Sequence, residues 1–157
     1  MTTELLVWQG LMDQAYAKWQ ANREWRYRQF LLNLDAIERK AVILGNFNYQ
    51  VCNGGIQQWV DNGYCVTAQD LLSILEEMDT ENSRRVAKIV REVLPHVDLT
   101  CTENRGFGQN YWADDEEWYD DTPPSWFEEI DKLTDEYYEF YESFTPEIEE
   151  YLARLTA

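Results

Sequence analysis

The fold is best approached from residues 48–64, NYQVCNGGIQQWVDNGY, which hold three of the seven glycines in the chain. Within this stretch Asn53, Gly54 and Gly55 predict a tight turn between two helices, because glycine tolerates positive φ angles that other residues avoid. Asparagine is a favoured N-cap residue, so Asn53 is expected to cap the helix that follows. The two glycines would let the flanking helices meet closely.

A short helix is predicted immediately after this turn. It covers residues 56–60 and carries Trp59 inward. Gly63 suits the left-handed position that commonly follows the end of a helix. Gln58 and Asn62 are expected to hydrogen-bond the turn. The motif is therefore interpreted as structural, and it does not by itself give the function.

Apolar residues recur at helical spacing on both sides of this motif. In the segment before it, Asn33-Leu34-Asp35 could cap a separate helix beginning near Ala36, so one long helix and two shorter ones both fit the pattern. Capping residues and a proline mark the other boundaries. The helices predicted before residue 97 cover residues 4–20, 25–52, 56–60, 68–78 with Thr67 as N-cap, and about 80–94, stopped by Pro95.

The C-terminal third is predicted to hold two helices. Six apolar residues fall on one helical stripe between residues 125 and 144, which predicts a single helix there. Thr145 is expected to cap a last helix, with Pro146 at its first position. No convincing strand pattern is present. The predicted fold is therefore all-α: a compact single-domain bundle of about six to seven helices over residues 1–157, with an acidic, partly irregular segment at 103–123.

Bulk composition limits the function classes. A length of 157 residues fits one domain, and the 15% aromatic content argues for a packed core. No stretch approaches the ~20 apolar residues of a membrane span, and the start lacks a signal-peptide pattern, so a cytoplasmic protein is expected. His96 is the only histidine and the three cysteines lack metal-binding spacing, so we expect neither a metal nor a cofactor. Carboxylates are too abundant to mark a catalytic pair, and no nucleophile motif is present, so an enzyme is not expected.

Negative charge is concentrated in the last third of the chain. The formal net charge is -17, and residues 103–151 hold 17 acidic residues against two bases, Arg105 and Lys132. Such a chain repels nucleic acid and anionic membrane and attracts cationic partners. Six bases near the N-terminus are interpreted either as a solvated helix face or as partners of the acidic third, within the fold or across a dimer: Lys18, Arg23, Arg26, Arg28, Arg39 and Lys40.

Acidic residues are predicted to form rows on the helix of residues 125–144. Steps of three or four place Asp131, Asp135, Glu139 and Glu142 in one continuous row. Residues 128–142 carry a net charge of -6 over roughly 22 Å, close to the one charge per ~3.4 Å of a DNA strand. An acid-rich surface kept for solubility is the alternative. The candidate partner-binding surface comprises Asp114, Asp115, Glu116, Glu117, Asp120, Asp121, Glu128, Asp131, Asp135, Glu139 and Glu142, with Glu147, Glu149 and Glu150 as contributors to a second row.

Residues 48–64 resemble the Asn-Gly-Gly signature of a bacterial family whose described member is a DNA-mimic protein. Cys52, Ile56 and Val60 depart from that pattern. The segment IDKLTDEYYEFYE, which begins at Ile130, is similar to the C-terminal helix of the family, and the resemblance covers roughly residues 35–155. The positions that match the signature are Val51, Asn53, Gly54, Gly55, Gln58, Trp59, Asn62 and Gly63.

The resemblance implies an all-α fold, a homodimer, and an acidic surface that imitates duplex phosphates. Together with the charge, it favours a protein that occupies the basic DNA-binding surface of a repressor, nucleoid protein or nuclease. The alternative is an immunity or adaptor protein that binds through exposed aromatics, for which Trp112, Trp118 and Tyr119 are candidates.

Overall fold

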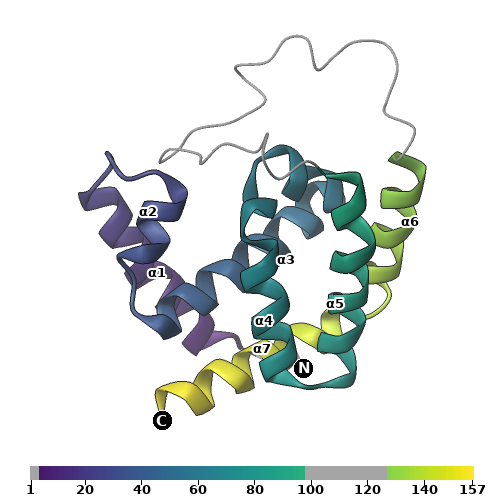
Figure 1. The fold of residues 1–157 in the computed structure, drawn as a ribbon. Coiled ribbons are helices and arrows are strands. Elements are labelled where there is room, and N and C mark those ends of the chain that lie inside the picture. The colour runs from purple at the N-terminus through teal and green to yellow at the C-terminus, as the bar shows by residue number, and fades with distance from the viewer. Residues whose placement is uncertain (1–3, 98–126) are drawn as a thin grey trace.

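Helix α3 (Ala36–Asp61) is the longest helix and lies at the centre of the fold (Figure 1). It begins at a capping box: the Asp35 carboxylate accepts from the Glu38 backbone N–H at 2.8 Å, and the Glu38 carboxylate accepts from the Asp35 N–H at 3.2 Å. Two of the four orphan N–H groups at a helix start are satisfied in this way. The separate helix beginning near Ala36 is thus confirmed, and the single helix over residues 25–52 is wrong.

The computed structural model describes residues 4–97 and 127–157. Within these ranges the chain forms helices and no strands, which confirms the all-α prediction. The elements are α1 (Leu6–Ala21), α2 (Tyr27–Leu32), α3 (Ala36–Asp61), η1 (Tyr64–Thr67), α4 (Ala68–Met78), α5 (Glu81–Val93), η2 (Leu94–His96), α6 (Phe127–Tyr138) and α7 (Tyr141–Thr156), where η denotes a short 3₁₀ helix.

The core of the described part is rich in aromatic rings. Helices α1 and α6 both pack against α3, α4 packs against α5, and α7 contacts α1 and α3 (Figure 1). Phe47 of α3 makes edge-to-face contacts at 5.3 Å between ring centroids with Trp59 and with Tyr137 of α6. The indole N–H of Trp8 donates to the Ala41 carbonyl at 2.9 Å, so the one polar atom of this buried ring is satisfied.

The boundaries of α4 and α5 follow the sequence closely. Helix α5 begins after Thr80, whose hydroxyl accepts from the Ser83 N–H at 2.9 Å. Thr67 precedes α4 as predicted, but its role as a cap is wrong. Its hydroxyl donates to the Tyr64 carbonyl at 2.9 Å, because η1 runs directly into α4 and already turns the backbone.

The predicted boundary between the last two helices is wrong. The break falls at Glu139 and Phe140, not at Thr145 and Pro146: Phe140 has φ -135° and ψ 0°, and its N–H bonds back only three residues, to the Tyr137 carbonyl at 3.1 Å. Pro146 lies inside α7. The Phe140 ring is buried and covered by the Arg85 guanidinium at 4.0 Å, so tertiary packing holds the break where no glycine or proline marks it.

Candidate functional site

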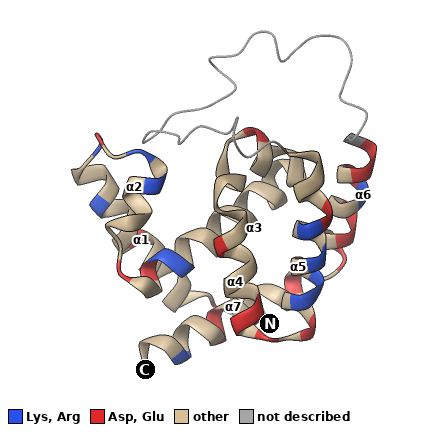
Figure 2. Ribbon diagram, viewed as in Figure 1, with Lys and Arg blue, Asp and Glu red and all other residues tan. Residues whose placement is uncertain are grey.

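The five predicted carboxylates that the structure describes are all exposed. Glu128, Asp131 and Asp135 lie on α6 at spacings of three and four residues, so they share one face of that helix. Glu139 lies at the break and Glu142 in the first turn of α7. Figure 2 shows acidic residues along α6 and basic residues along the neighbouring α5. The lysine of α6 is Lys132.

The continuous row from Asp131 to Glu142 is wrong. It required one helix through residue 144, and the break at residues 139–140 interrupts it. What remains is a shorter row on α6, from Glu128 to Asp135, followed by two carboxylates on the α6–α7 junction and α7. We name these five side chains the α6–α7 acidic surface: Glu128, Asp131, Asp135, Glu139 and Glu142.

Most of this surface is not neutralised by the bases of the described chain. The one ion pair within it joins Glu139 to the Arg85 guanidinium at 3.9 Å, near the limit for such a contact. Glu128, Asp131, Asp135 and Glu142 make no ion pair with a described lysine, arginine or histidine. Their charge is therefore available to an external cation.

The proposed second row is partly committed to the fold. The Glu149 carboxylate accepts from the backbone N–H groups of Val7 at 2.6 Å and Trp8 at 2.8 Å, so it caps the start of α1 from α7. Glu147 accepts a hydrogen bond from the Asn82 amide. Glu150 is exposed. Glu149 is thus removed from the candidate partner-binding residues.

Four of the six N-terminal bases pair with carboxylates or donate to carbonyls outside the acidic third. Lys18 pairs with the buried Glu38 at 2.5 Å, and Lys40 pairs with Glu77 at 2.8 Å. Arg28 and Arg39 donate to backbone carbonyls of residues 31–66. These bases stabilise the N-terminal two thirds of the fold, and they form no ion pair with the α6–α7 acidic surface.

The remaining candidates lie outside the described residues. They are Asp114, Asp115, Glu116, Glu117, Asp120 and Asp121 of the predicted acidic surface, the aromatics Trp112, Trp118 and Tyr119, and the start of the helix predicted from residue 125.

The Asn-Gly-Gly turn is a kink within α3. Gly54 has φ -150° and Gly55 has φ +82° and ψ 174°, so the helix is interrupted there and resumes at Ile56. Gly63, with φ +81°, occupies the left-handed position after the helix end, as predicted. A Cβ on Gly55 would lie 3.3 Å from the Thr134 side chain of α6, so α3 and α6 meet closely at this residue.

The role predicted for Asn53 is wrong. Its side-chain amide donates to the side-chain oxygen of Gln58 at 3.3 Å. It does not accept a backbone N–H from the first turn of the resumed helix. The acceptor for the resumed helix is the Thr134 hydroxyl, which takes the Ile56 N–H at 2.9 Å. The resumed helix is thus capped by a side chain that lies 78 residues later in the chain, and not by a local residue.

Gln58 and Asn62 hydrogen-bond within the motif, as predicted. Both side-chain amides donate to the side-chain oxygen of Gln50 (Oε1), at 2.8 Å and 2.7 Å. This network joins the two segments of α3 across the kink. The motif is therefore structural in the described chain, and its residues are distinct from the acidic surface.

The comparisons with known proteins identify the family. The model of the DMP19-like protein family matches residues 32–155. The chain belongs to this family. No curated protein and no solved structure matches it. The match confirms the DNA-mimic family expected from the sequence, although it does not single out the Asn-Gly-Gly turn as a signature. Helix α1 and most of α2 precede the part that matches the DMP19-like family.

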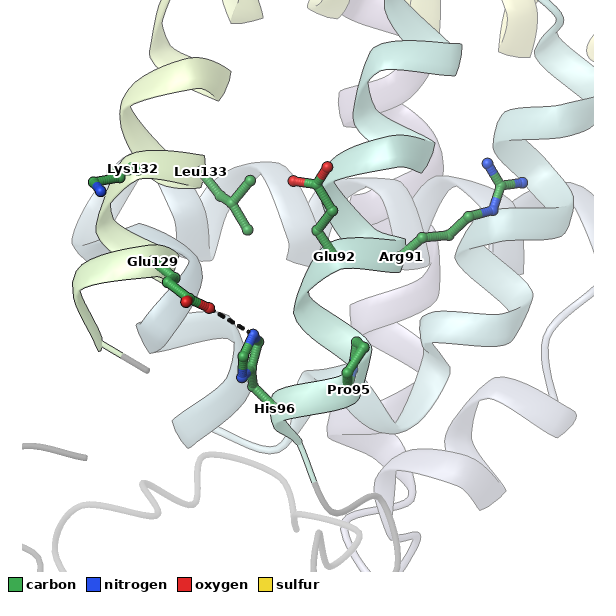
Figure 3. A pocket seen from close by; sticks show the side chains of 7 residues that line it. All are labelled: Arg91, Glu92, Pro95, His96, Glu129, Lys132 and Leu133. Carbon is green, nitrogen blue, oxygen red and sulfur yellow. Dashed lines mark ion pairs between the residues drawn. The ribbon is translucent and has the colours of Figure 1, made fainter. Parts of the chain in front are cut away.

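A cavity of about 580 Å³ lies between α5 and α6 (Figure 3). Its wall includes His96, whose Nε2 lies 2.9 Å from the Glu129 carboxylate, together with Glu92, Arg91 and Lys132. In Figure 3 Arg91 and Lys132 point away from each other on opposite sides, so the charges do not converge on one ligand atom.

Two further findings concern the described ranges alone. They contain no group of three or more histidine, cysteine or acidic side chains that could hold a metal ion. None of their helices is long and apolar enough to cross a membrane.

Sequence reasoning missed residues whose role depends on the fold. Thr134 and Glu149 act on backbone 78 and 141 residues away or more, and no local pattern reports such contacts. Tyr138 was assigned no role, yet its ring is 40% exposed between Asp135 and Glu139. The usable signal in the run DEYYEFYE is its tyrosines, because tyrosine is enriched at protein interfaces.

Proposed function

We propose that the protein binds the basic DNA-binding surface of a partner protein, with its exposed carboxylates taking the place of DNA phosphates. The observation that supports this most strongly is the α6–α7 acidic surface, in which four of the five carboxylates have no ion pair in the described chain. Membership in the DMP19-like family supports the same function. Catalysis is not part of the proposal.

The charge density of α6 fits this role. Its 12 residues carry five acids and one lysine, a net charge of -4. At ~1.5 Å per residue they extend roughly 18 Å, which gives one net charge per ~4.5 Å, against ~3.4 Å for a DNA strand. Solubility alone would not require such local density, since like charges at i,i+4 destabilise a helix by a few tenths of a kcal/mol per pair.

A homodimer, as the family resemblance implies, would present two such surfaces to one partner. We propose this arrangement as the assembly that engages a two-fold symmetric DNA-binding protein. Light scattering on the purified protein tests it, and a monomeric mass at working concentration would contradict it.

The test begins with capture of partners from a host lysate, elution by a salt gradient and identification by mass. The dissociation constant of the purified partner is then measured against salt concentration, with and without competing duplex DNA. We expect DNA and this protein to compete, and log affinity to fall steeply with log salt. Binding that is insensitive to salt and to DNA would contradict mimicry and favour an adaptor that uses aromatics.

A matched pair of variants separates the surface from net charge. The first neutralises Glu128, Asp131, Asp135 and Glu142 as Gln or Asn. The control neutralises four exposed acids elsewhere, Asp13, Glu24, Asp70 and Glu76. Both lose four charges. We expect the first to lower affinity at least tenfold and to flatten the salt dependence, and the control to change both far less. Equal effects would show that only net charge matters.

A further inference from the structure

Within residues 4–97 and 127–157, two of the chain's own cations lie near both a carboxylate and an aromatic ring. Arg85 lies 4.0 Å above the Phe140 ring and 3.9 Å from the Glu139 carboxylate. Lys40 lies 5.9 Å from the Tyr151 ring centre and 2.8 Å from Glu77, whose pKa is lowered by the hydrogen bond from Lys40. A cation gains from both groups, since the ring face is negative and the carboxylate is charged.

A third set of carboxylates and rings has no such cation. Tyr138 and Tyr141 lie edge to face, with ring centroids 6.2 Å apart, on either side of the α6–α7 junction. Asp135 precedes Tyr138 by one helical turn, and Glu142 accepts from the Tyr141 hydroxyl at 3.3 Å. Among residues 4–97 and 127–157, no lysine or arginine lies against either ring or pairs with either carboxylate.

The acids lie close enough to the rings to affect their ionisation. The negative charge of Glu142 is the main cause of the raised pKa of Tyr141. Burial and then nearby groups, Asp135 among them, raise the pKa of Tyr138. Each ring thus has a carboxylate nearby, and no lysine or arginine of the described residues lies over either ring.

The rings are also held in position before any partner arrives. The Tyr138 hydroxyl donates to the Val51 carbonyl of α3 at 2.6 Å, which anchors the ring while 40% of the side chain stays exposed. Rigid tyrosines give large contact area at little entropic cost, which is why they are enriched at interfaces.

We propose that Tyr138 and Tyr141, together with Asp135 and Glu142, form a docking surface for arginine side chains of the partner. Arginine fits better than lysine because its planar guanidinium stacks on an aromatic ring while it donates to a carboxylate. This inference rests on the proposed function, since the partner is taken to be basic, and it assigns the side chain that the surface selects. Carboxylates would then guide association, and the tyrosines would favour arginine-rich partners.

The test uses two peptides of equal charge, eight arginines and eight lysines, titrated into the full-length protein by calorimetry. We expect the wild type to prefer the arginine peptide. Replacing both rings (Tyr138→Leu, Tyr141→Leu) keeps the apolar bulk and removes the ring faces. At ~2- to 5-fold per ring, affinity for the arginine peptide should fall roughly 4- to 25-fold, and the preference should vanish.

Three controls accompany this variant. Tyr138→Phe with Tyr141→Phe keeps the rings and should keep the preference, even though the bond to Val51 is lost. Leu32→Ala removes an apolar side chain that is 74% exposed on α2, at the opposite end of the molecule from α6, and should change nothing (Figure 1). Circular dichroism establishes that each variant is folded.

The outcomes separate the two proposals. If the wild type shows no preference, or if the leucine variant keeps it, the arginine surface is wrong whatever the partner is. If the preference behaves as expected but duplex DNA does not compete with the captured partner, the docking surface stands and mimicry of DNA fails.

Discussion

Gly55 combines φ +82° with ψ 174°, a conformation that is essentially restricted to glycine, and it lies against Thr134 of α6. We predict that Gly55→Ala lowers the free energy of unfolding by about 1–3 kcal/mol, because the backbone is strained and the added Cβ crowds the hydroxyl that caps the resumed helix. Urea denaturation measures the change. Gly10→Ala is the control: nothing lies within 4 Å of its Cβ, and in the middle of α1 alanine should stabilise by about 0.5–1 kcal/mol. Equal effects of the two would contradict this account of the kink.

The kink leaves the buried N–H of Ile56 without an acceptor in its own helix, and Thr134 supplies one. Its hydroxyl accepts from Ile56 at 2.9 Å and donates to the Ile130 carbonyl at 3.1 Å. Thr134→Val keeps the shape and removes both bonds, so the Ile56 N–H is left buried without a partner and stability should fall by about 1–3 kcal/mol. Thr134→Ser retains the hydroxyl and should recover most of the loss. A valine variant as stable as the wild type in urea would show that the bond is dispensable.

Asp61, at the end of α3, has a buried carboxylate oxygen with no hydrogen-bond partner. Burial raises its pKa to about 7 from an ordinary value near 3.8. The folded protein therefore keeps this proton where the unfolded chain loses it, so the contribution of Asp61 to stability falls as pH rises between about 4 and 7. Asp61→Asn removes this dependence. We expect the melting temperature of the variant, relative to that of the wild type, to be higher at about pH 8 than at about pH 5. A difference in melting temperature that does not change with pH would contradict this explanation.

At the scale of elements, α7 caps α1 through Glu149. The carboxylate replaces the local N-cap that α1 lacks, since Leu5 offers no side-chain acceptor. Glu149→Ala should cost about 0.5–2 kcal/mol and speed hydrogen exchange at Val7 and Trp8, whose N–H groups lose their acceptor. The exposed neighbour Glu150→Ala is the matched control and should leave exchange in α1 unchanged. Protection that survives in the Glu149 variant would contradict the cap.

Helix positions were predictable wherever local chemistry specifies them. Thr80 marks the start of α5, Gly63 marks the end of α3, and the helical spacing of apolar residues gives α1 and α4. The α6–α7 break was not predictable, because Phe140 is a good helix residue that is held out of the helix by its buried site beneath Arg85. Pro146 gave a false boundary for the same reason: packing, and not local propensity, decides where α7 begins.

The sequence predicted which acidic residues are exposed in the candidate site, but not which side chains lie beside them. The exposure of Glu128, Asp131 and Asp135 follows from helical periodicity alone. No spacing rule reveals contacts between residues that are 87 or more positions apart. Such contacts hold Glu149 at the start of α1 and anchor the Tyr138 ring beside Asp135.

At the scale of the whole molecule, the proposed binding of a basic partner rests on how charge is distributed along the chain. Lys18 and Lys40 pair with carboxylates of the first two thirds, and Arg39 donates to a backbone carbonyl there. Four of the five carboxylates of the α6–α7 acidic surface have no ion pair in the described chain, and Glu139 has one with Arg85. Such a molecule should associate fast with a cationic partner and lose affinity as salt screens the attraction.

The most direct test of mimicry is competition for one partner. A captured DNA-binding protein is loaded with fluorescent duplex DNA and titrated with this protein at several salt concentrations. Mimicry predicts complete displacement of DNA by the wild type, a shift of at least tenfold to higher concentration when Glu128, Asp131, Asp135 and Glu142 are neutralised, and little shift for the control with four neutralised acids elsewhere. Formation of a ternary complex that retains the DNA would contradict it.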